Sequence, residues 1–449
     1  MHIRSPSIVA EKPLYGRGKE LAQRIFLDTL AAIDVRQAIF SKLRIEGKAL
    51  QAGDLTVPLL RPPRVVSLGK AACRMAAALD EMLGGKIESG VVVAPELPGR
   101  EVGRFRYFAG GHPYPTAGSV QGAEAALELV SGLREQDVVV FLVSGGGSAL
   151  FEKPLDPSVT LRDLVEFNRV LVTCGLPIEQ INVLRKHISA VKGGRLATRA
   201  YPAHQLTVFV SDVPAHFTSM VASGPTMPDE STLDQAYTIA AGNNLVAKFP
   251  AAIRKQFEQQ RLEETPKPED PEFCNAGYFC LLSNRDAVEA ASAAAAKHGF
   301  ASEIDSSDWD IDYQQVVRAN LACLDALSRE RQGEPVCLVA GGEVICPVTG
   351  PGSGGRNQAF VLYAAQQIAD RNRVVLSAGT DGRDGNSPTS GAVADGRTLS
   401  RARALHLDPG DYLARSDSYF FFRALGDTLD TGFTDNNVRD VRLWLDFNS

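Results

Sequence analysis

The chain has 449 residues, of which 44% are hydrophobic and 22% charged, and this composition excludes a disordered or fibrous protein. At about 150 residues per domain, the length predicts two or three domains. The net charge of −6 argues against a nucleic-acid-binding protein, because phosphate contacts require clustered Lys and Arg side chains.

Membrane proteins and proteins with a cysteine-bound metal ion are also disfavoured. The apolar run 138–143 is far shorter than the roughly 20 residues that a spanning helix needs, and no secretory h-region follows Met1. The seven cysteines have no metal-ligand spacing, which predicts reduced thiols. We therefore expect a cytoplasmic protein with no membrane partner.

The first half of the chain alternates short apolar runs with amphipathic stretches. Strands are predicted at 64–69, 89–94, 137–143 and 205–212, and helices at 18–39, 71–83, 117–133 and 161–173. Continuous apolar strands between helices are typical of a parallel sheet covered on both faces. The pattern predicts an α/β fold with a Rossmann-like arrangement.

The segment 263–272 is rich in proline and acidic residues, a composition that favours a linker. Beyond it the α/β alternation resumes, with strands predicted at 278–282, 335–340 and 373–378 and an alanine-rich helix at 286–298. We therefore predict two α/β domains, 1–262 and 272–449.

Two glycine-containing turns of the first domain follow predicted strands. In open α/β sheets, ligands bind at the carboxyl ends of strands, where helix N-termini attract anions. Lys70, in Ser67-Leu-Gly-Lys70, would lie beside a phosphate bound there, although it could equally be a solvated surface lysine. The second turn predicts an anion site built from backbone N–H groups, at Ser144, Gly145, Gly146, Gly147 and Ser148.

Two more turns lie in the second domain. The first contains G-x-G-x-x-G from Gly350 to Gly355, a weak sign of dinucleotide binding because no acidic strand tip follows at the required distance. It is followed by a guanidinium suited to phosphate or carboxylate, and its predicted binding residues are Gly354, Gly355, Arg356 and Asn357. Asp381 and Asp384, in another glycine-rich turn, could hold Mg²⁺ or simply form the turn.

Further charged side chains come from two segments of the first domain. Arg185 and Lys192 belong to a basic run whose two glycines make an anion site plausible, although such runs are commonly solvated helix faces. Asp212 ends a strand and is a candidate metal ligand or general base. His112 is interpreted as a structural residue rather than a site residue.

Common catalytic motifs are absent from the sequence. It contains no P-loop, no H-E-x-x-H, no G-x-S-x-G and no C-x-x-C. This disfavours P-loop nucleotide hydrolases, zinc hydrolases and serine hydrolases. Anion-binding turns with spare cations and carboxylates fit phosphoryl transfer best.

The motifs, in this order, resemble the glycerate 2-kinase family, whose C-terminal part is called the MOFRL domain. The matching segments cover nearly the whole chain and are 67–70, 111–113, 143–150, 184–189, 192–197, 211–214, 222–226, 283–286, 341–343, 354–358, 377–382, 417–421 and 437–438. The resemblance implies phosphorylation of D-glycerate on its 2-hydroxyl, with ATP and Mg²⁺, in a cleft between the two domains. It also implies that Lys70 and Arg356 match the family's cleft lysine and arginine.

The sequence departs from the family pattern at Ala215-His216-Phe217, at Ala359, at Thr116 and in the segment 431–437. The family pattern has polar residues at several of these positions, which would shape the substrate pocket. The departures therefore affect the prediction of the acceptor more than the prediction of kinase chemistry. A kinase for a related small hydroxy acid, a nicotinamide-dependent hydroxypyruvate reductase and a non-catalytic anion-binding protein therefore stay as alternatives.

The predicted mechanism depends on positioning and charge neutralisation. Lys70 and Arg356 would neutralise the phosphoryl group or the acceptor carboxylate, and the turn 145–148 would donate backbone N–H groups. The roles of metal ligand and base are left open among Asp212, Asp381 and Asp384. The expected partners are small-molecule substrates, and the oligomeric state stays open, a homodimer included.

Overall fold

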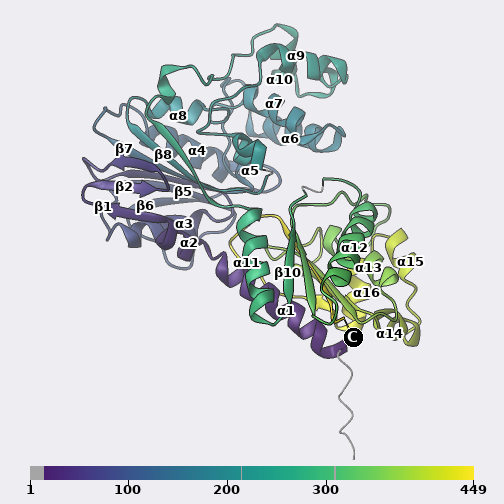
Figure 1. Ribbon diagram of the computed structural model, residues 1–449. Helices are drawn as coiled ribbons and strands as arrows, with labels where there is room; N and C mark the ends of the chain where they lie inside the picture. The colour runs from purple at the N-terminus through teal and green to yellow at the C-terminus, as the bar shows by residue number, and fades with distance from the viewer. Residues whose placement is uncertain (1–14, 214, 308–309, 449) are drawn as a thin grey trace, which may run out of the picture. The chain divides into compact units, whose positions relative to one another are not determined.

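The computed structural model describes residues 15–213, 215–307 and 310–448. The chain forms two compact units, which we name by their residues (Figure 1). Unit 1 comprises Met1–Ala32, Arg285–Thr434 and Arg439–Ser449, and unit 2 comprises Ile33–Asn284 and Asp435–Val438. Neither unit is a continuous stretch of chain.

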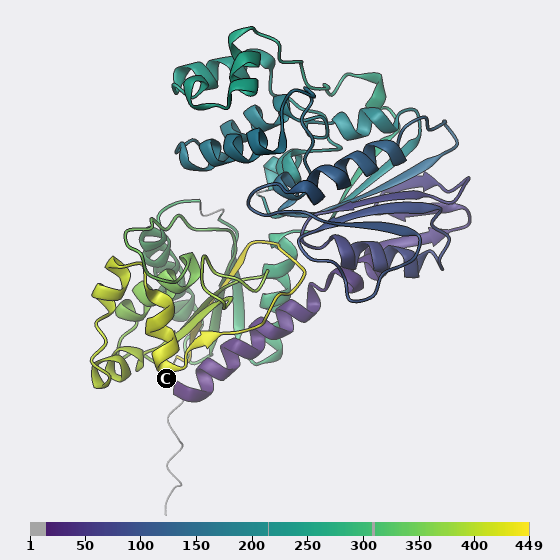
Figure 2. The same cartoon turned by 180° about the vertical axis from the view of Figure 1, so that it is seen from behind.

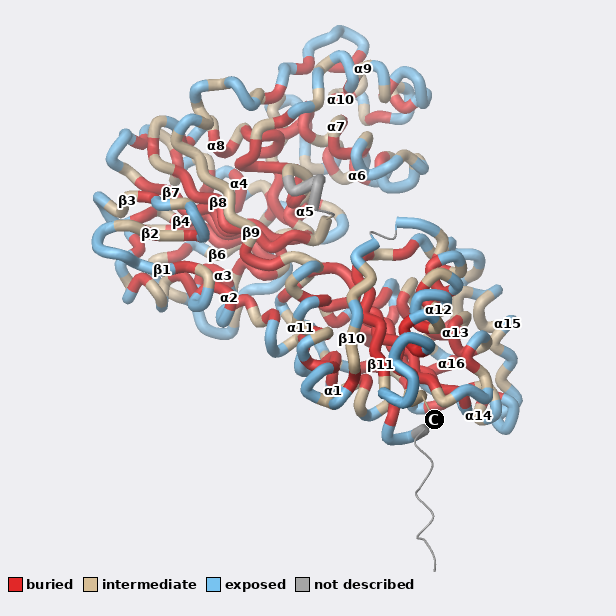
Figure 3. The backbone as a smooth tube through the Cα atoms, in the orientation of Figure 1, coloured by how far each residue is buried: buried red, intermediate tan, exposed pale blue. Residues whose placement is uncertain are grey.

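Unit 2 is built around a six-stranded sheet whose strand order is β6-β5-β4-β7-β8-β9. Every neighbouring pair in it is parallel. The strands are β4 (Arg64–Leu68), β5 (Ser89–Ala94), β6 (Phe105–Ala109), β7 (Val138–Val143), β8 (His204–Val210) and β9 (Ala276–Leu282). All residues of β7 are buried, as its unbroken apolar sequence predicts (Figure 3).

Helices cover both faces of this sheet. The crossover helices α3 (Ala72–Met82) and α4 (Ala117–Leu129) lie on opposite faces (Figures 1 and 2). The other helices of unit 2 are α2 (Val35–Lys42), α5 (Gly147–Leu150), α6 (Leu161–Thr173), α7 (Ile178–Ile188), α8 (Arg195–Ala200), α9 (Leu233–Gly242), α10 (Ala251–Glu258) and the 3₁₀ segments η1 (Ala215–Ser223), η2 (Val246–Lys248) and η3 (Pro271–Phe273). A small antiparallel sheet joins β1 (Leu43–Glu46), β2 (Ala49–Ala52) and β3 (Leu55–Pro58).

Unit 1 has a second six-stranded sheet, of order β10-β11-β15-β12-β13-β14. Only β10 and β11 pair in parallel, and the remaining pairs are antiparallel. The strands are β10 (Ala301–Asp305), β11 (Val336–Ala340), β12 (Arg373–Gly379), β13 (Gly391–Asp395), β14 (Thr428–Leu429) and β15 (Asp440–Asp446). Unit 1 is therefore also α/β, but its sheet is mixed, whereas the sheet of unit 2 is parallel.

The helices of unit 1 also pack on both faces of their sheet. The N-terminal helix α1 lies against β12 and β13, whereas α12 and α13 pack on the other face around Phe360 and Trp444 (Figure 1). The helices are α1 (Tyr15–Ala32), α11 (Asn284–Lys297), α12 (Tyr313–Glu330), α13 (Arg356–Gln367), α14 (Thr398–Ala404), α15 (Pro409–Ala414) and α16 (Ser418–Leu425).

The predicted α/β strands are present, with ends that differ by at most two residues from the prediction. The helix predicted at 18–39 is instead two helices, α1 and α2. Asp34 interrupts it, because its carboxylate accepts a hydrogen bond from the backbone N–H of Gln37 at 2.9 Å and caps α2. The two helices belong to different units.

The boundary predicted at 263–272 is not where the structure divides the chain. This segment lies within unit 2, and Thr265 in it is buried. The Glu264 carboxylate accepts hydrogen bonds from Lys267 at 2.8 Å and from the backbone N–H of Leu233 at 2.9 Å. Composition favoured a linker here, but these polar contacts hold the segment against α9. The units separate after Asn284 instead.

Among the described residues, no helix combines the length and apolar character needed to cross a membrane. All seven cysteines are free thiols, as their irregular spacing predicted.

Candidate functional site

Three strands of unit 2 end at the same edge of the parallel sheet. Leu68 of β4 pairs with Val143 of β7, which pairs in turn with Phe209 of β8. The turns after these strands therefore start side by side, as expected for the carboxyl edge of a parallel sheet. They carry Lys70, the glycine turn 144–148 and Asp212, all of which the sequence singled out.

The first two turns are tied together through Ser144. The Ser144 hydroxyl donates to the carbonyl of Leu68 at 3.3 Å and accepts from the backbone N–H of Ala71 at 3.0 Å. The backbone N–H of Lys70 donates to the carbonyl of Gly145 at 2.9 Å. A Cβ at Gly69, where φ is +110°, would lie 2.3 Å from the Ser144 hydroxyl. Glycine is required at this position because the two turns touch.

Four side chains surround the backbone of Gly145 and Gly146. A Cβ at Gly145 would lie 2.1 Å from Oδ2 of Asp212 and 3.2 Å from Nδ2 of Asn437. A Cβ at Gly146 would lie 3.2 Å from Cγ of Lys70 and 3.5 Å from Cδ2 of His112. The structure thus brings together an ammonium-bearing side chain, a carboxylate, an amide and an imidazole around the backbone of Gly145, which is buried, and of Gly146, which is partly buried. This is an arrangement suited to binding and transferring an anionic group.

Asn437 and His112 were not predicted as site residues. Asn437 lies in the short segment Asp435–Val438, which returns to unit 2 from the far end of the sequence. Its place in the matching segment 437–438 was the signal that could have identified it. His112 was interpreted as structural, yet its ring lies beside the glycine turn, close to Gly146.

Lys192 does not reach a solvated surface. Its ammonium is fully buried and contacts the Glu152 carboxylate and, at 3.3 Å, the carbonyl of Phe151. Burial lowers the pKa of Lys192, and the charge of Glu152 opposes that shift. Glu152 lies two residues after α5, so this ion pair ties Lys192 to the end of the helix that follows the glycine turn. We assign it to holding the turn rather than to contact with a ligand.

Arg185 is also turned inward. Its Nε donates to Oδ1 of Asn168 at 3.1 Å, and burial lowers its pKa. The basic run of α7 is therefore not a solvated helix face. One carboxylate, that of Glu152, lies close enough to both Arg185 and Lys192 to favour their charged forms.

Arg356 begins helix α13 in unit 1 and is held by two carboxylates. Its Nε and Nη2 donate to the two oxygens of Asp440 at 2.6 and 2.9 Å, and Nη2 also donates to Glu343 at 2.9 Å. The Asp440 and Glu343 carboxylates hold the pKa of Arg356 above its ordinary value, although burial opposes them. The sequence assigned this planar guanidinium to a phosphate or carboxylate of the ligand, whereas in the structure its two parallel bonds are made with Asp440. The Arg356 side chain is still about one third exposed, at 35%.

Asp384 caps the same helix. Its two carboxylate oxygens accept hydrogen bonds from the backbone N–H groups of Asn357 at 3.0 Å and Gln358 at 2.8 Å. The side chain is buried, and this burial raises its pKa to about 7 despite the two N–H donors. Asp384 is buried and already accepts two backbone hydrogen bonds, so of the two carboxylates in this loop it is the less accessible to a metal ion. Asn357 belongs to the same buried network, because its side-chain oxygen accepts from the Ser377 hydroxyl at 2.5 Å.

Asp381 is the more accessible carboxylate of this loop. It accepts a hydrogen bond from the backbone N–H of Arg383 at 3.0 Å, which is the turn-forming contact of an Asp-Gly loop. Within residues 15–213, 215–307 and 310–448, no three His, Cys, Asp or Glu side chains are grouped so as to hold a metal ion.

The glycines from Gly350 to Gly355 serve close packing of the chain on itself. A Cβ at Gly350 would lie 2.6 Å from the carbonyl oxygen of Arg415, and a Cβ at Gly355 would lie 2.2 Å from Asp384. Gly354 is similarly close to the Ser418 hydroxyl, at 2.4 Å. The segment that precedes α13 is not a strand–turn–helix unit, because β11 ends at Ala340. The G-x-G-x-x-G pattern therefore lacks the structural context of a dinucleotide site.

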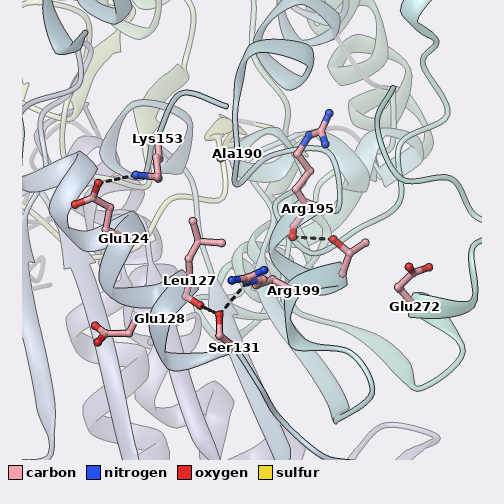
Figure 4. A pocket seen from close by; sticks show the side chains of 10 residues that line it. Glu124, Leu127, Glu128, Ser131, Lys153, Ala190, Arg195, Arg199 and Glu272 are labelled. Carbon is pink, nitrogen blue, oxygen red and sulfur yellow. Dashed lines mark hydrogen bonds and ion pairs between the residues drawn. The ribbon is translucent and has the colours of Figure 1, made fainter. Parts of the chain in front are cut away.

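A separate surface pocket of unit 2 lies between α4 and α8 (Figure 4). Lys153 pairs there with Glu124 at 2.6 Å, and Nε of Arg199 donates to the Ser131 hydroxyl at 2.8 Å. None of the predicted site residues lines it; the lining residues are Glu124, Leu127, Glu128, Ser131, Lys153, Ala190, Arg195, Thr198, Arg199 and Glu272. The pocket is therefore distinct from the strand-end residues described above.

Two family models match the chain. A domain of unknown function, DUF4147, matches residues 21–258, and the MOFRL family matches residues 336–440. These segments cover most of unit 2 and the part of unit 1 from β11 to β14, so the resemblance inferred from the motifs is confirmed.

Curated relatives and a solved structure agree with these matches. A Thermotoga maritima protein named D-glycerate 2-kinase is 36% identical over 399 residues, which is 87% of this chain and 92% of its own. An Agrobacterium vitis protein that carries a provisional hydroxypyruvate reductase name is 35% identical over 94% of this chain and 93% of its own. A Thermotoga maritima crystal structure titled glycerate kinase covers 95% of this chain and 99% of its own, with 33% identity and a TM-score of 0.81. From the motifs, the two α/β units and these matches, we conclude that the chain belongs to the glycerate 2-kinase family.

Proposed function

We propose that this protein is an ATP-dependent kinase that phosphorylates the 2-hydroxyl of D-glycerate and releases 2-phosphoglycerate. One observation carries the proposal: β4, β7 and β8 end in register, and their turns place Lys70 and Asp212 on either side of the glycine turn. The relatives named for this activity, one of them 36% identical over 87% of this chain, support it.

Each group has a role that follows from its chemistry. The backbone N–H groups of Gly145 to Ser148 would bind phosphoryl oxygens, since glycines allow close approach. The Lys70 ammonium would neutralise charge that builds up on the transferring group. Asp212 would accept the proton of the attacking hydroxyl or hold the metal ion. Arg356 and Asp381 stay proposed site residues of unit 1, with a partly exposed guanidinium and a partly exposed carboxylate.

Mg²⁺ is the metal that such a kinase implies. It is commonly held by one or two protein carboxylates, with substrate phosphates and waters as the other ligands. Asp212 and Asp381 fit that donor set, because each is a partly exposed carboxylate after a strand. Asp384 is a less accessible candidate, since it is buried and both its oxygens already accept hydrogen bonds from α13. When bound, the ion would neutralise charge on the phosphate chain.

A coupled assay of ADP release tests the proposal. Purified protein with ATP, MgCl₂ and D-glycerate should release ADP, and leaving out any one component should stop it. A matched reaction with hydroxypyruvate and reduced nicotinamide should show no change in absorbance, because the glycine pattern at Gly350 is occupied by the chain itself. Nicotinamide oxidation without ADP release would favour the reductase. Nucleotide binding without turnover of a panel of hydroxy acids would favour a non-catalytic protein.

We also propose that the enzyme acts in the cytoplasm. Its seven cysteines are free thiols, which is the usual state in a reducing compartment.

A further inference from the structure

A chain of three polar side chains runs from the core of unit 2 to the glycine turn. The Ser223 hydroxyl donates to Oδ1 of Asn182 at 3.1 Å, and the oxygens of Ser223 and Ser148 lie 2.7 Å apart. Asn182 and Ser223 are buried, whereas Ser148 is only partly buried. This row of hydrogen-bonded side chains therefore begins on α7 with Asn182. It continues through Ser223 at the end of η1 and reaches the first turn of α5 at Ser148.

The direction of the hydrogen bonds follows from the number of protons. A serine hydroxyl carries one proton and two lone pairs. The proton of Ser223 is committed to Asn182, so the bond between the two serines must use the proton of Ser148. Ser148 thus gives its only proton inward to Ser223, and its lone pairs stay available toward the partly exposed side.

The backbone holds this arrangement in place. Ala222 and Ser223 both have positive φ, 53° and 62°, a conformation that non-glycine residues rarely adopt. A Cβ at Gly147 would lie 2.4 Å from Cβ of Ala222, so the turn and the end of η1 touch. Such strain persists where surrounding contacts fix it, often at binding sites.

We propose that Ser148 is a specificity-determining residue that accepts a hydrogen bond from the non-reacting 3-hydroxyl of the acceptor. This inference rests on the proposed function. A hydroxyl whose proton is engaged is a poor donor to phosphate oxygens, which are acceptors only. It can instead recognise a substrate group that donates. The 2-hydroxyl loses its proton when it is phosphorylated, whereas the 3-hydroxyl keeps its proton throughout the reaction.

The substrate class that follows is a small 2-hydroxy acid with a second hydroxyl on the next carbon. D-lactate has the same carboxylate and 2-hydroxyl but a methyl group in place of the hydroxymethyl group, so it is the matched probe. A site that pairs with a substrate hydroxyl discriminates strongly against an analogue without it. Removing the Ser148 oxygen should remove part of that discrimination.

The experiment compares kcat/KM for D-glycerate and D-lactate in the wild type, Ser148→Ala and Ser223→Ala. Ser400→Ala, on the exposed face of α14, is the control. In Ser148→Ala, we expect kcat/KM for D-glycerate to fall about tenfold and that for D-lactate to change less than twofold. Ser223→Ala should also lower the ratio of kcat/KM for D-glycerate to that for D-lactate, but by less. In this variant the Ser148 hydroxyl is kept, and only its hydrogen bond to Ser223 is lost. Ser148→Thr keeps the hydroxyl, so it should keep the preference for D-glycerate over D-lactate that Ser148→Ala loses.

A binding measurement keeps the inference separate from the proposed function. Calorimetric titration should show that the wild type binds D-glycerate more tightly than D-lactate, by a margin that Ser148→Ala abolishes. An equal loss for both acids in Ser148→Ala would overturn the inference, because the serine would then serve the turn or Lys70. Absence of ADP release by the wild type would reject the proposed kinase, and the binding preference would still decide the role of Ser148.

Discussion

Arg356 and Asp440 form a two-pronged ion pair in unit 1, with N–H···O distances of 2.6 and 2.9 Å, although they lie 84 residues apart in the sequence. Asp440 is buried, and the Arg356 and Arg442 guanidinium groups hold the pKa of its carboxyl below the ordinary value, against the effect of burial. The pair joins the start of α13 to the start of β15.

Arg356→Lys should therefore impair both stability and activity. An ammonium lacks the planar fork, so one of the two charge-assisted bonds to the buried Asp440 carboxylate is lost. We expect the free energy of unfolding to fall by about 2 kcal/mol and kcat/KM to fall at least about tenfold. Urea unfolding and steady-state kinetics measure the two effects. Arg285→Lys, on an exposed guanidinium of α11, should change neither. Unchanged stability in Arg356→Lys would mean that the pair with Asp440 is not maintained in solution.

Lys70→Ala tests the proposed neutralisation of charge at the glycine turn. Loss of a charge-assisted contact to a transferring phosphoryl group lowers the rate about a hundredfold or more. We expect kcat to fall by that order while the unfolding transition stays close to that of the wild type. Lys248→Ala, at an exposed position of η2, is the matched control. Near wild-type turnover of a folded Lys70→Ala protein would remove Lys70 from the mechanism.

Gly145→Ala tests the contact between the glycine turn and Asp212. The added methyl group would lie 2.1 Å from Oδ2 of Asp212, so the carboxylate or the turn must shift. Since misplacement of about 1 Å is enough to impair catalysis, we expect kcat/KM to fall about a hundredfold. Gly242→Ala is the control, because no atom lies within 4 Å of its added methyl group. Kinetics within twofold of the wild type would show that the turn and the carboxylate move freely apart.

The pKa of Asp384 predicts a pH dependence of stability. Burial raises this pKa to about 7, above the value near 3.9 expected in the unfolded chain. The folded state therefore binds the proton more tightly, and this group's stabilising contribution is present below about pH 4 and is lost as the pH rises to about 7. Asp384→Asn mimics the protonated side chain and cannot titrate.

The measurement is urea unfolding of both proteins between pH 4.5 and 7.5. We expect the stability of Asp384→Asn relative to the wild type to rise with pH, by on the order of 1 kcal/mol per pH unit. Asp408→Asn, which changes a surface cap of α15, serves as the comparison. A constant difference between wild type and Asp384→Asn across this range would contradict the raised pKa.

The acidic segment 263–272 should resist limited proteolysis in the native protein. Glu264 anchors it through Lys267, Leu233 and the His187 ring, and these hydrogen bonds lower the pKa of Glu264 to about 2 although burial opposes them. Glu264→Gln removes the charge, so cleavage within 263–272 should become faster. Glu258→Gln, on the exposed face of α10, is the control. Mass spectrometry of the fragments locates the cuts, and rapid cleavage of the wild type at 263–272 would argue for an exposed linker.

Local sequence patterns predicted five of the six strands of the parallel sheet and the three turns of unit 2, because each depends on neighbouring residues, but only two of the six strands in the mixed sheet of unit 1. The apolar run of β7 and the glycines that follow it are such a pattern. Partners of charged side chains depend on distant segments, so the pairing of Arg356 with Asp440 and of Lys192 with Glu152 was not predicted. The same holds for the segment 263–272, whose composition gave no sign of the contacts that bury Thr265.

The short segment Asp435–Val438 has a consequence for how the protein can be made. It belongs to unit 2, but the residues on both sides of it belong to unit 1, and its Asn437 lies beside Gly145. During synthesis, this amide leaves the ribosome only after all other parts of unit 2 up to Asn284 have been translated. A gene fragment that ends at Asn284 would therefore encode the parallel sheet and its glycine turn without Asn437, and it would also carry α1 without the strands that α1 covers. An isolated unit 2 therefore needs a new covalent connection that joins 435–438 to 33–284, which truncation alone does not provide.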